Sequence, residues 1–307
     1  MENTKKKTVM ADLALLFCAV IWGFGFVATD LSLSNGITTY YTMAIRFGVA
    51  FILLAIIFFN KLKNIKKQDL KAGIVVGLVL FLAFTTQTIG LNYTTPGKQA
   101  FLTGLNVVMV PFFYWFVKKK RPDNYTFIAT FICLLGMGLL SLNGGASLKG
   151  GQLLGDGLTI LCAVFFALYI IVVEYFTEKT DPIIITILQM ATATVLSIGA
   201  VIISGDPMPT NVPVVGWVAV VYLGAVSTMV AYIVQNIAQK YTTSTHAAII
   251  LSLESVFGAI ASVIILGELF TVKMVVGCAF ILIGLITAET KWGFLRKKKE
   301  KELENVA

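Results

Sequence analysis

Charged side chains are scarce in this sequence: Asp, Glu, Lys and Arg make up 13% of its 307 residues, whereas 57% are hydrophobic. Soluble globular proteins carry roughly 25% charged residues, so this chain lacks the polar side chains needed to cover a water-facing surface. Disordered proteins combine low hydrophobicity with high net charge, and this class is excluded as well. The composition therefore predicts an integral membrane protein.

Histidine and cysteine are rare as well. The single histidine leaves too few ligands for a histidine-based metal site, and no Cys-x-x-Cys pair is present. The four cysteines lie in apolar stretches and are interpreted as small packing residues, so no disulfide is predicted. The sequence also lacks a P-loop, a Gly-x-Ser-x-Gly motif and a cluster of acidic residues. We therefore expect no metal and no cofactor, and direct coupling to ATP would require a partner protein.

The formal net charge of +8 comes mostly from short basic blocks, at residues 5–7, 61–71, 118–121 and 296–301. A nucleic-acid-binding protein would gather such charges on one binding face, so nucleic acid is not an expected partner. Basic blocks between apolar segments are instead typical of the cytoplasmic loops of multi-pass membrane proteins.

Ten apolar segments are long enough to cross a membrane, which takes about 20 residues of helix. They are separated by polar or Gly/Pro-rich breaks and cover residues 10–30, 38–60, 70–91, 95–117, 125–143, 152–176, 183–204, 213–239, 243–266 and 271–290. The first is too long for the core of a signal peptide, and no small-residue cleavage site follows it. With both termini in the cytoplasm, most of the 24 Lys and Arg residues fall on the cytoplasmic side, which predicts this orientation in the plasma membrane.

The second half of the chain repeats the first. Residues 87–136 align without a gap with residues 235–284, and we call two residues that share a position in the two copies repeat mates. Apolar matches between membrane helices carry little weight, so the evidence rests on the polar matches and on a short match between the first and sixth spans. These are Gln87 with Gln235, Tyr93-Thr94-Thr95 with Tyr241-Thr242-Thr243, and Cys18-Ala19-Val20 with Cys162-Ala163-Val164.

Each copy contains five spans, and because five is odd the second copy must enter the membrane from the opposite side. The predicted fold is an all-α membrane protein of ten transmembrane helices in two inverted five-helix repeats. The first repeat covers residues 1–143, the second covers 152–290, and a basic cytoplasmic tail covers 291–307. Inverted repeats place a binding site near the membrane midplane and supply two interchangeable conformations for alternating access.

Three short patterns carry a resemblance to a known family. They are Ile21-Trp22-Gly23, Ile45-Arg46-Phe47, and Leu253-Glu254 followed by Gly267-Glu268. With these patterns the sequence resembles the EamA-type ten-helix transporters of the drug/metabolite transporter superfamily. The resemblance implies a central cavity lined mainly by spans one, three, four, six, eight and nine, with spans five and ten at the periphery. The family pattern usually has proline after the mid-helix glutamate, whereas Ser255 follows Glu254 here.

Few ionisable residues fall at membrane depth, where they are costly and usually face the protein interior or a water-filled cavity. Glu254 lies near the middle of span nine and is the first candidate to bind a substrate ammonium group or to take up a proton. The alternative is a permanent structural pair with Arg46 or with a polar side chain. Arg46 could itself hold a substrate carboxylate, but the resemblance does not place span two at the cavity. We therefore interpret Arg46, together with Glu268, as a structural charge.

Two further ionisable residues open spans at equivalent positions. Lys98 follows Pro96-Gly97 at the start of span four, where free amide groups favour an anion, and it is a substrate-binding candidate. Its alternative is to extend to the membrane interface. Its repeat mate His246 is a second candidate for proton coupling, and the alternative is an interfacial histidine without that role.

Amide and aromatic side chains complete the predicted substrate site. Amides in membrane helices either hold helices together or face a polar cavity, and aromatic side chains could form the walls of such a cavity. The amides are Gln87, Asn106, Gln235 and Asn236, and the aromatic residues are Trp22, Phe84, Tyr169 and Tyr232.

Together these features predict a secondary transporter for small metabolites, above all amino acids or related zwitterions, with proton coupling as one option. A channel without coupling is the closest alternative. A membrane-embedded enzyme is a weaker one, because it would need a catalytic constellation that the sequence lacks. The expected partners are the small-molecule substrate and the lipid bilayer, and the sequence leaves a homodimer open.

Overall fold

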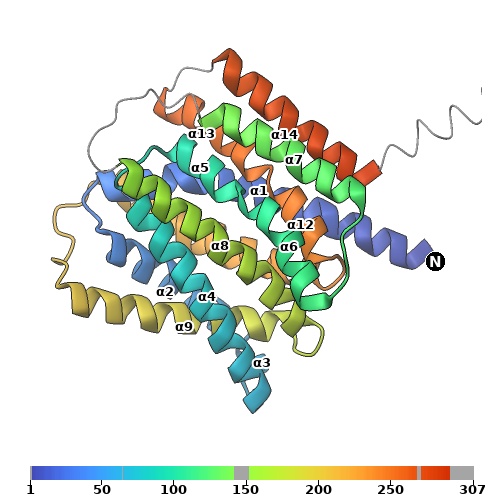
Figure 1. Cartoon of the computed structure of the whole chain (residues 1–307). Helices are drawn as coiled ribbons and strands as arrows, with labels where there is room; N and C mark the ends of the chain where they lie inside the picture. Colours follow the sequence, from blue (N-terminus) through green and yellow to red (C-terminus); the bar gives the residue numbers. More distant parts are fainter. Residues whose placement is uncertain (1, 64, 142–151, 268–270, 291–307) are drawn as a thin grey trace, which may run out of the picture.

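The computed structural model describes residues 2–63, 65–141, 152–267 and 271–290, and these residues form helices and connecting turns without a β-strand. The predicted basic tail and Glu268 lie outside these ranges. In chain order (Figure 1) the helices are α1 (Glu2–Ser34), α2 (Thr39–Ile57), α3 (Phe59–Leu62), α4 (Lys67–Leu91), α5 (Pro96–Gly104), α6 (Asn106–Lys118), α7 (Asn124–Ser141), α8 (Gln152–Thr177), α9 (Pro182–Ser204), α10 (Val214–Tyr222), the π-helix η1 (Leu223–Val230), α11 (Ala231–Gln239), α12 (Ser244–Leu251), α13 (Glu254–Leu266) and α14 (Val272–Thr290).

Among the described residues, eight helical stretches are long and apolar enough to cross a membrane. Three of them join several helices: α5 with α6, α10 through η1 to α11, and α12 with α13. Of the remaining helices, α7 and α14 contain shorter apolar segments, Asn124–Gly136 and Val275–Gly284. The chain is therefore an all-helical, multi-pass membrane protein, while the count of ten spans stays a prediction.

Large apolar side chains cover the outside of the helix bundle. Phe116, Leu153 and Ile203 have exposed fractions of 76%, 87% and 89%. Contact of such a surface with water costs about 25 cal/mol per Å², whereas lipid tails solvate the same surface at no such cost. The outward faces thus confirm that the bilayer is the solvent of this protein.

Two of the spanning stretches are interrupted near their middle. α5 gives way to α6 at Leu105, and α12 gives way to α13 at Ser252 and Leu253. At both breaks a backbone N–H group bonds three residues back, Leu105 N to Leu102 O at 3.2 Å and Leu253 N to Ile250 O at 3.2 Å. This is the tighter 3₁₀ pattern. The sequence predicts continuous helices here, because no proline marks either break.

Helices α7 and α14 pack against each other at the edge of the bundle (Figure 1). Glycines allow the close approach: a Cβ on Gly136 would lie 2.6 Å from the carbonyl oxygen of Gly277, and one on Gly284 would lie 2.5 Å from the sulfur of Cys133. Their place at the edge agrees with what the resemblance implies for spans five and ten.

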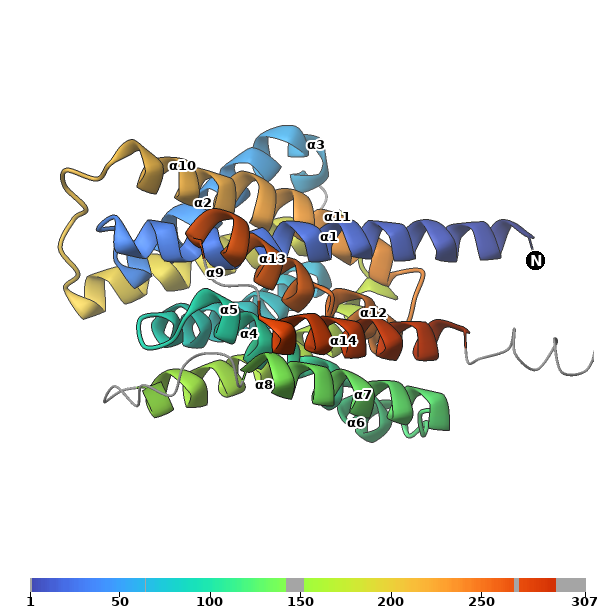
Figure 2. The same ribbon diagram turned by 90° about the horizontal axis from the view of Figure 1, so that it is seen from above.

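The bundle has two ends, and α1 begins at one of them (Figure 2), which we call the N-terminal end. Contacts of α1 identify other segments at this end. Lys7 Nζ lies over the ring of Tyr241, 5.8 Å from the ring centroid. Tyr241 belongs to the connection between α11 and α12. Asp12 faces His246 near the start of α12, with 3.7 Å between Oδ1 and Nε2. The N-terminal end therefore includes the connection from α11 to α12.

Candidate functional site

A small cavity lies in the middle of the bundle, beside the two helix breaks. Ten helices contribute to its wall: α1, α2, α4, α5, α6, α8, η1, α11, α12 and α13. Its free volume is about 40 Å³, which has room for a few water molecules but is too small for an amino acid. Most residues of the predicted substrate site line it, namely Trp22, Phe84, Gln87, Asn106, Tyr169, Tyr232, Gln235 and Glu254.

Glu254 is the first residue of α13 and lines the cavity from the second helix break. Its side chain is buried, with 7% of the residue exposed. Within the described part of the chain, no hydrogen bond or ion pair reaches its carboxylate. An ionised carboxylate that is buried without a partner costs several kcal/mol. A cationic ligand or a proton would therefore be favoured at this position.

Arg46 lines the same cavity from α2, and 3% of the residue is exposed. Its Nε donates to Thr228 Oγ1 at 2.8 Å, and one terminal nitrogen donates to Ser227 Oγ at 3.4 Å. The guanidinium also lies over the ring of Phe84, 4.0 Å from its centroid. Neutral hydroxyls and a ring hold this cation in place without neutralising its charge. The structure therefore places the predicted structural charge at the cavity wall, available to an anionic group.

Aromatic rings form one continuous wall of the cavity. The ring of Tyr232 lies 5.0 Å from that of Trp22, 5.6 Å from that of Tyr169 and 6.2 Å from that of Phe84, measured between centroids. Phe84 continues the wall to Phe166, at 5.3 Å. The tilted and edge-on geometries of these pairs are the favourable ones for aromatic rings, so the wall is preorganised.

Two amides in the wall have oxygen atoms without a donor. Among the described residues, Asn106 Oδ1 and Gln235 Oε1 are buried and make no hydrogen bond. Buried polar atoms almost always have partners, and leaving an acceptor unsatisfied costs about 1–3 kcal/mol. The third amide, Gln87, is occupied through its nitrogen, which donates to Thr103 Oγ1 at 3.4 Å. Asn106 and Gln235 therefore indicate where a ligand with N–H groups would bind.

Asn236 is placed outside this cavity, in a polar network between helices. Its Nδ2 donates to Thr186 Oγ1 at 2.9 Å and to Gln189 Oε1 at 3.3 Å. The hydroxyl of Tyr169 lies 3.2 Å from Asn236 Oδ1 and joins the same network. These bonds connect α8, α9 and α11, which is the helix-holding role that buried amides take in membrane proteins.

Lys98 and His246 are also placed away from the cavity. Lys98 pairs with Asp156 across α5 and α8, with 2.6 Å between Nζ and Oδ2. His246 faces Asp12 across α12 and α1. Since Lys98 and His246 are repeat mates, the structure places a basic side chain opposite an aspartate at both positions.

One pair at the surface involves a shifted pKa. Asp181 caps α9 by accepting from the amide of Ile183 at 2.8 Å, and it pairs with Lys61. Partial burial raises the pKa of Asp181, but the hydrogen bonds from Lys61 and Ile183 outweigh that effect and hold the pKa below its usual value.

Among the residues that the structure describes, no group of three or more His, Cys, Asp or Glu is placed to hold a metal ion.

Comparisons with known proteins agree with this architecture. The EamA-like transporter family matches residues 9–142 and 153–289. An uncharacterized transporter of Archaeoglobus fulgidus is 31% identical over 280 residues, which cover 91% of this chain and 86% of the relative. The chain belongs to the EamA-like transporter family. The family and its relatives indicate a transporter rather than an enzyme.

Other relatives of this EamA-like transporter are more distant. The uncharacterized transporter YyaM of Bacillus subtilis is 24% identical, over 88% of this chain and 92% of the relative. A crystal structure of another protein superposes with a TM-score of 0.76 and 19% identity, covering 93% of this chain and 98% of that one. At this identity the likeness shows the fold alone.

The cavity of this EamA-like transporter also includes residues that sequence reasoning missed. Phe166 is the repeat mate of Trp22 in the register of the cysteine-containing match, so the repeat could have identified it. Thr103 lies one helical turn before Asn106 and could have been found from helical periodicity. Ser227 lies in the π-helix η1, and its carbonyl accepts from Trp22 Nε1 at 2.9 Å. No sequence pattern signals a π-helix, which is often found at functional sites.

Proposed function

We propose that this transporter is a secondary carrier, built from two inverted five-helix repeats, that works by alternating access. The helix breaks support the repeat: Leu105 and Leu253 are mates, and each directly precedes the second half of its span. The helix starts agree as well. Thr95 Oγ1 accepts from Lys98 N at 3.4 Å, and its mate Thr243 accepts from the amide of His246 at 3.3 Å.

The composition of the cavity wall supports the same arrangement. If a two-fold axis relates the repeats, residues on the axis must meet their own mates. Several pairs of mates do line the cavity together: Phe84 with Tyr232, Gln87 with Gln235, Asn106 with Glu254, and Trp22 with Phe166. A site on the axis can be exposed alternately to either side when one repeat adopts the conformation of the other.

The substrate class follows from the unsatisfied groups in this wall. Asn106 and Gln235 offer acceptor oxygens without a donor among the described residues, and Glu254 adds a carboxylate to the same cavity wall. An ammonium group carries three N–H donors and a positive charge, so it matches this set. Arg46 supplies the opposite charge and a planar fork for a carboxylate. We propose that the substrate is a small zwitterion of the amino-acid type. The main support for this proposal is that the acceptor oxygens of Glu254, Asn106 and Gln235 belong to residues that line one cavity.

The cavity of about 40 Å³ must expand before such a molecule can bind. We assign the N-terminal end to the cytoplasmic side of the plasma membrane, because Lys7, Lys118 and the connection that contains Lys240 lie at this end and basic residues favour the cytoplasmic side. We propose that Glu254 exchanges protons, because its buried carboxyl group would release its proton when a substrate ammonium group binds to it.

Thermal shift with purified protein tests the substrate class, because a ligand that binds the folded state stabilises it. An amino acid should raise the melting temperature, whereas its decarboxylated amine and its deaminated acid should do so much less. Glu254→Gln should weaken binding of the amino acid about 10-fold or more, as expected for loss of a charge-assisted hydrogen bond. Equal shifts with the amino acid and both analogues would contradict the zwitterion site.

Reconstituted vesicles separate a carrier from a channel. A carrier shows saturable counterflow, in which unlabelled amino acid inside the vesicles drives uptake of labelled amino acid. Ohmic single-channel currents without counterflow would instead support the channel. Proton coupling predicts that Glu254→Gln retains counterflow at saturating amino acid but loses the stimulation of net transport by a pH gradient. An unchanged response to the pH gradient would contradict that role of Glu254.

A further inference from the structure

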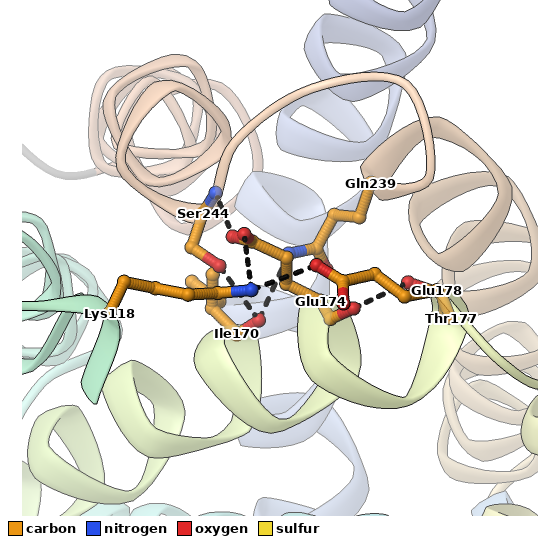
Figure 3. A network of polar contacts seen from close by, with 7 residues as sticks. All are labelled: Lys118, Ile170, Glu174, Thr177, Glu178, Gln239 and Ser244. Carbon is orange, nitrogen blue, oxygen red and sulfur yellow. Dashed lines mark hydrogen bonds and ion pairs between the residues drawn. The ribbon is translucent and has the colours of Figure 1, made fainter. Parts of the chain in front are cut away.

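A group of polar contacts lies at the N-terminal end of the bundle, where α12 begins (Figure 3). Glu174 on α8 accepts a hydrogen bond from the backbone N–H of Ser244, with 2.7 Å between Oε2 and N. Lys118 Nζ lies 3.8 Å from Glu174 Oε1 and 2.8 Å from Glu178 Oε1. The ends of α6 and α8 and the start of α12 are thereby held together.

One turn earlier in α8, the carbonyl oxygen of Ile170 accepts two more hydrogen bonds. Gln239 Nε2 at the end of α11 donates at 3.2 Å, and Ser244 Oγ donates at 3.2 Å. Gln239 and Ser244 are buried, with 2% and 0% exposed. Ile170 also lines the cavity, so these bonds connect the cavity wall with the polar contacts at the N-terminal end.

The two-fold related contacts cannot form at the opposite end. In the repeat, the mate of Gln239 is Leu91 and the mate of Ser244 is Pro96. Leu91 has no side-chain donor, and Pro96 has neither a hydroxyl nor a backbone N–H. None of the three bonds donated by Gln239 and Ser244 has a counterpart there.

From this asymmetry we infer a lock, a set of contacts that keeps the cavity closed toward the cytoplasm. We call the two ends of the bundle at which the cavity can open its cytoplasmic and outer mouths. The lock consists of Glu174, Ile170, Gln239 and Ser244. The inference rests on the proposed alternating access and adds a resting preference to it. Two repeats with equal contacts at both mouths would populate the two conformations equally. Bonds present at one mouth only shift the population toward the state in which that mouth is closed. The resting carrier is therefore predominantly closed to the cytoplasm.

Accessibility of a cavity residue tests the lock without requiring a known substrate. Leu251 lines the cavity and is 3% exposed, so Leu251→Cys provides a reporter thiol. The four native cysteines are all buried, and the parent chain without the reporter measures their background. Labelling rates with a membrane-impermeant thiol reagent are compared in right-side-out and inside-out vesicles.

The lock is removed by giving the cytoplasmic mouth the residues of the opposite one, Gln239→Leu and Ser244→Pro. Ser244 is the first residue of α12, where proline is tolerated, as Pro96 shows at the start of α5. We expect labelling from the cytoplasmic side to rise about tenfold or more, the scale expected from losing a hydrogen bond to a charged group, while labelling from outside falls. Gln68→Leu is the matched control, since Gln68 is exposed and bonds to Lys179 outside the lock, and it should leave both rates unchanged.

The opposite change provides a second test. Leu91→Gln together with Pro96→Ser introduces the donors at the outer mouth and should lower labelling from outside. The lock is overturned if removing its residues leaves cytoplasmic labelling unchanged, if it raises labelling from outside, or if the reporter thiol reacts from neither side. If the lock variants shift accessibility while amino acids show no counterflow, the lock stands and the proposed substrate fails. Equal and fast labelling from both sides in the parent reporter indicates a pore, which overturns alternating access and the lock together.

Discussion

Two buried glutamates in this transporter should respond in opposite directions to the same substitution. Glu254 and Glu174 are both buried, with 7% and 9% of each residue exposed. Glu174 accepts a hydrogen bond from Ser244 N at 2.7 Å and faces Lys118, whereas no partner of Glu254 is present in the described ranges. We expect Glu254→Gln to stabilise the protein without substrate and Glu174→Gln to destabilise it.

The magnitudes follow from the partners of each side chain. A glutamine at position 254 cannot ionise, and its N–H₂ group can donate to the acceptors that lack a partner, Asn106 Oδ1 and Gln235 Oε1. At about 1 kcal/mol for each hydrogen bond, the gain in unfolding free energy should be about 1–2 kcal/mol. Glutamine in place of Glu174 can still accept from Ser244 but loses the attraction of Lys118 and the charge assistance. The loss should be about 1–2 kcal/mol.

The assay is thermal unfolding of the purified protein in detergent at neutral pH, without ligand. A thiol-reactive dye reports unfolding directly, because all four native cysteines are buried in the folded protein. At about 2 °C for each kcal/mol in a chain of this size, the melting temperatures of the two variants should differ by about 4–8 °C. If both variants melt earlier than the parent by similar amounts, Glu254 is held by a charged partner, and the reasoning about an unpartnered carboxylate is refuted.

Three further predictions concern a cation, a glycine and a surface pair. Arg46→Lys keeps the charge but loses the planar fork, so the KM for uptake in reconstituted vesicles should rise about tenfold while kcat changes less; an unchanged KM would contradict substrate contact. Gly284→Val should lower stability by about 1–3 kcal/mol, because α7 and α14 must separate, whereas the control Gly199→Val has open space around its new side chain and should melt near the parent temperature. Asp181→Asn removes a carboxylate whose pKa is lowered in the folded protein. Its stabilisation is present at neutral pH and lost as the pH falls through the folded-state pKa, so the difference in melting temperature from the parent should shrink toward pH 3, and a constant difference would contradict the ionic contribution.

Much of the fold follows from local sequence patterns, because the length and polarity of each segment set where a helix can cross the bilayer. The predicted span of residues 70–91, for example, lies within α4, Lys67–Leu91. The interruptions at Leu105 and Leu253 could not be predicted in this way. They replace ordinary helical hydrogen bonds by three-residue ones without proline, so no residue type marks them.

The candidate site shows the same division. Gln87 and Gln235 were selected by their positions in the repeat, and the structure places both at the cavity. Lys98 was selected by its place at the start of a span and Asn236 as an amide beside Gln235, yet they face Asp156 and a polar network between helices. A repeat determines which positions are equivalent, but it does not determine which face of a helix turns toward the axis.

The sequence by itself determined the solvent, the helical class and the resemblance to a transporter family, because these depend on residue types and their order along the chain. Only the tertiary structure decided which groups share the cavity and which lack partners. Arg46 reaches Thr228 and Ser227 across a large separation in sequence, and Glu174 meets the start of α12. Hydrogen bonds form over about 3 Å, so such contacts depend on how the helices pack and cannot be derived from spacing along the chain.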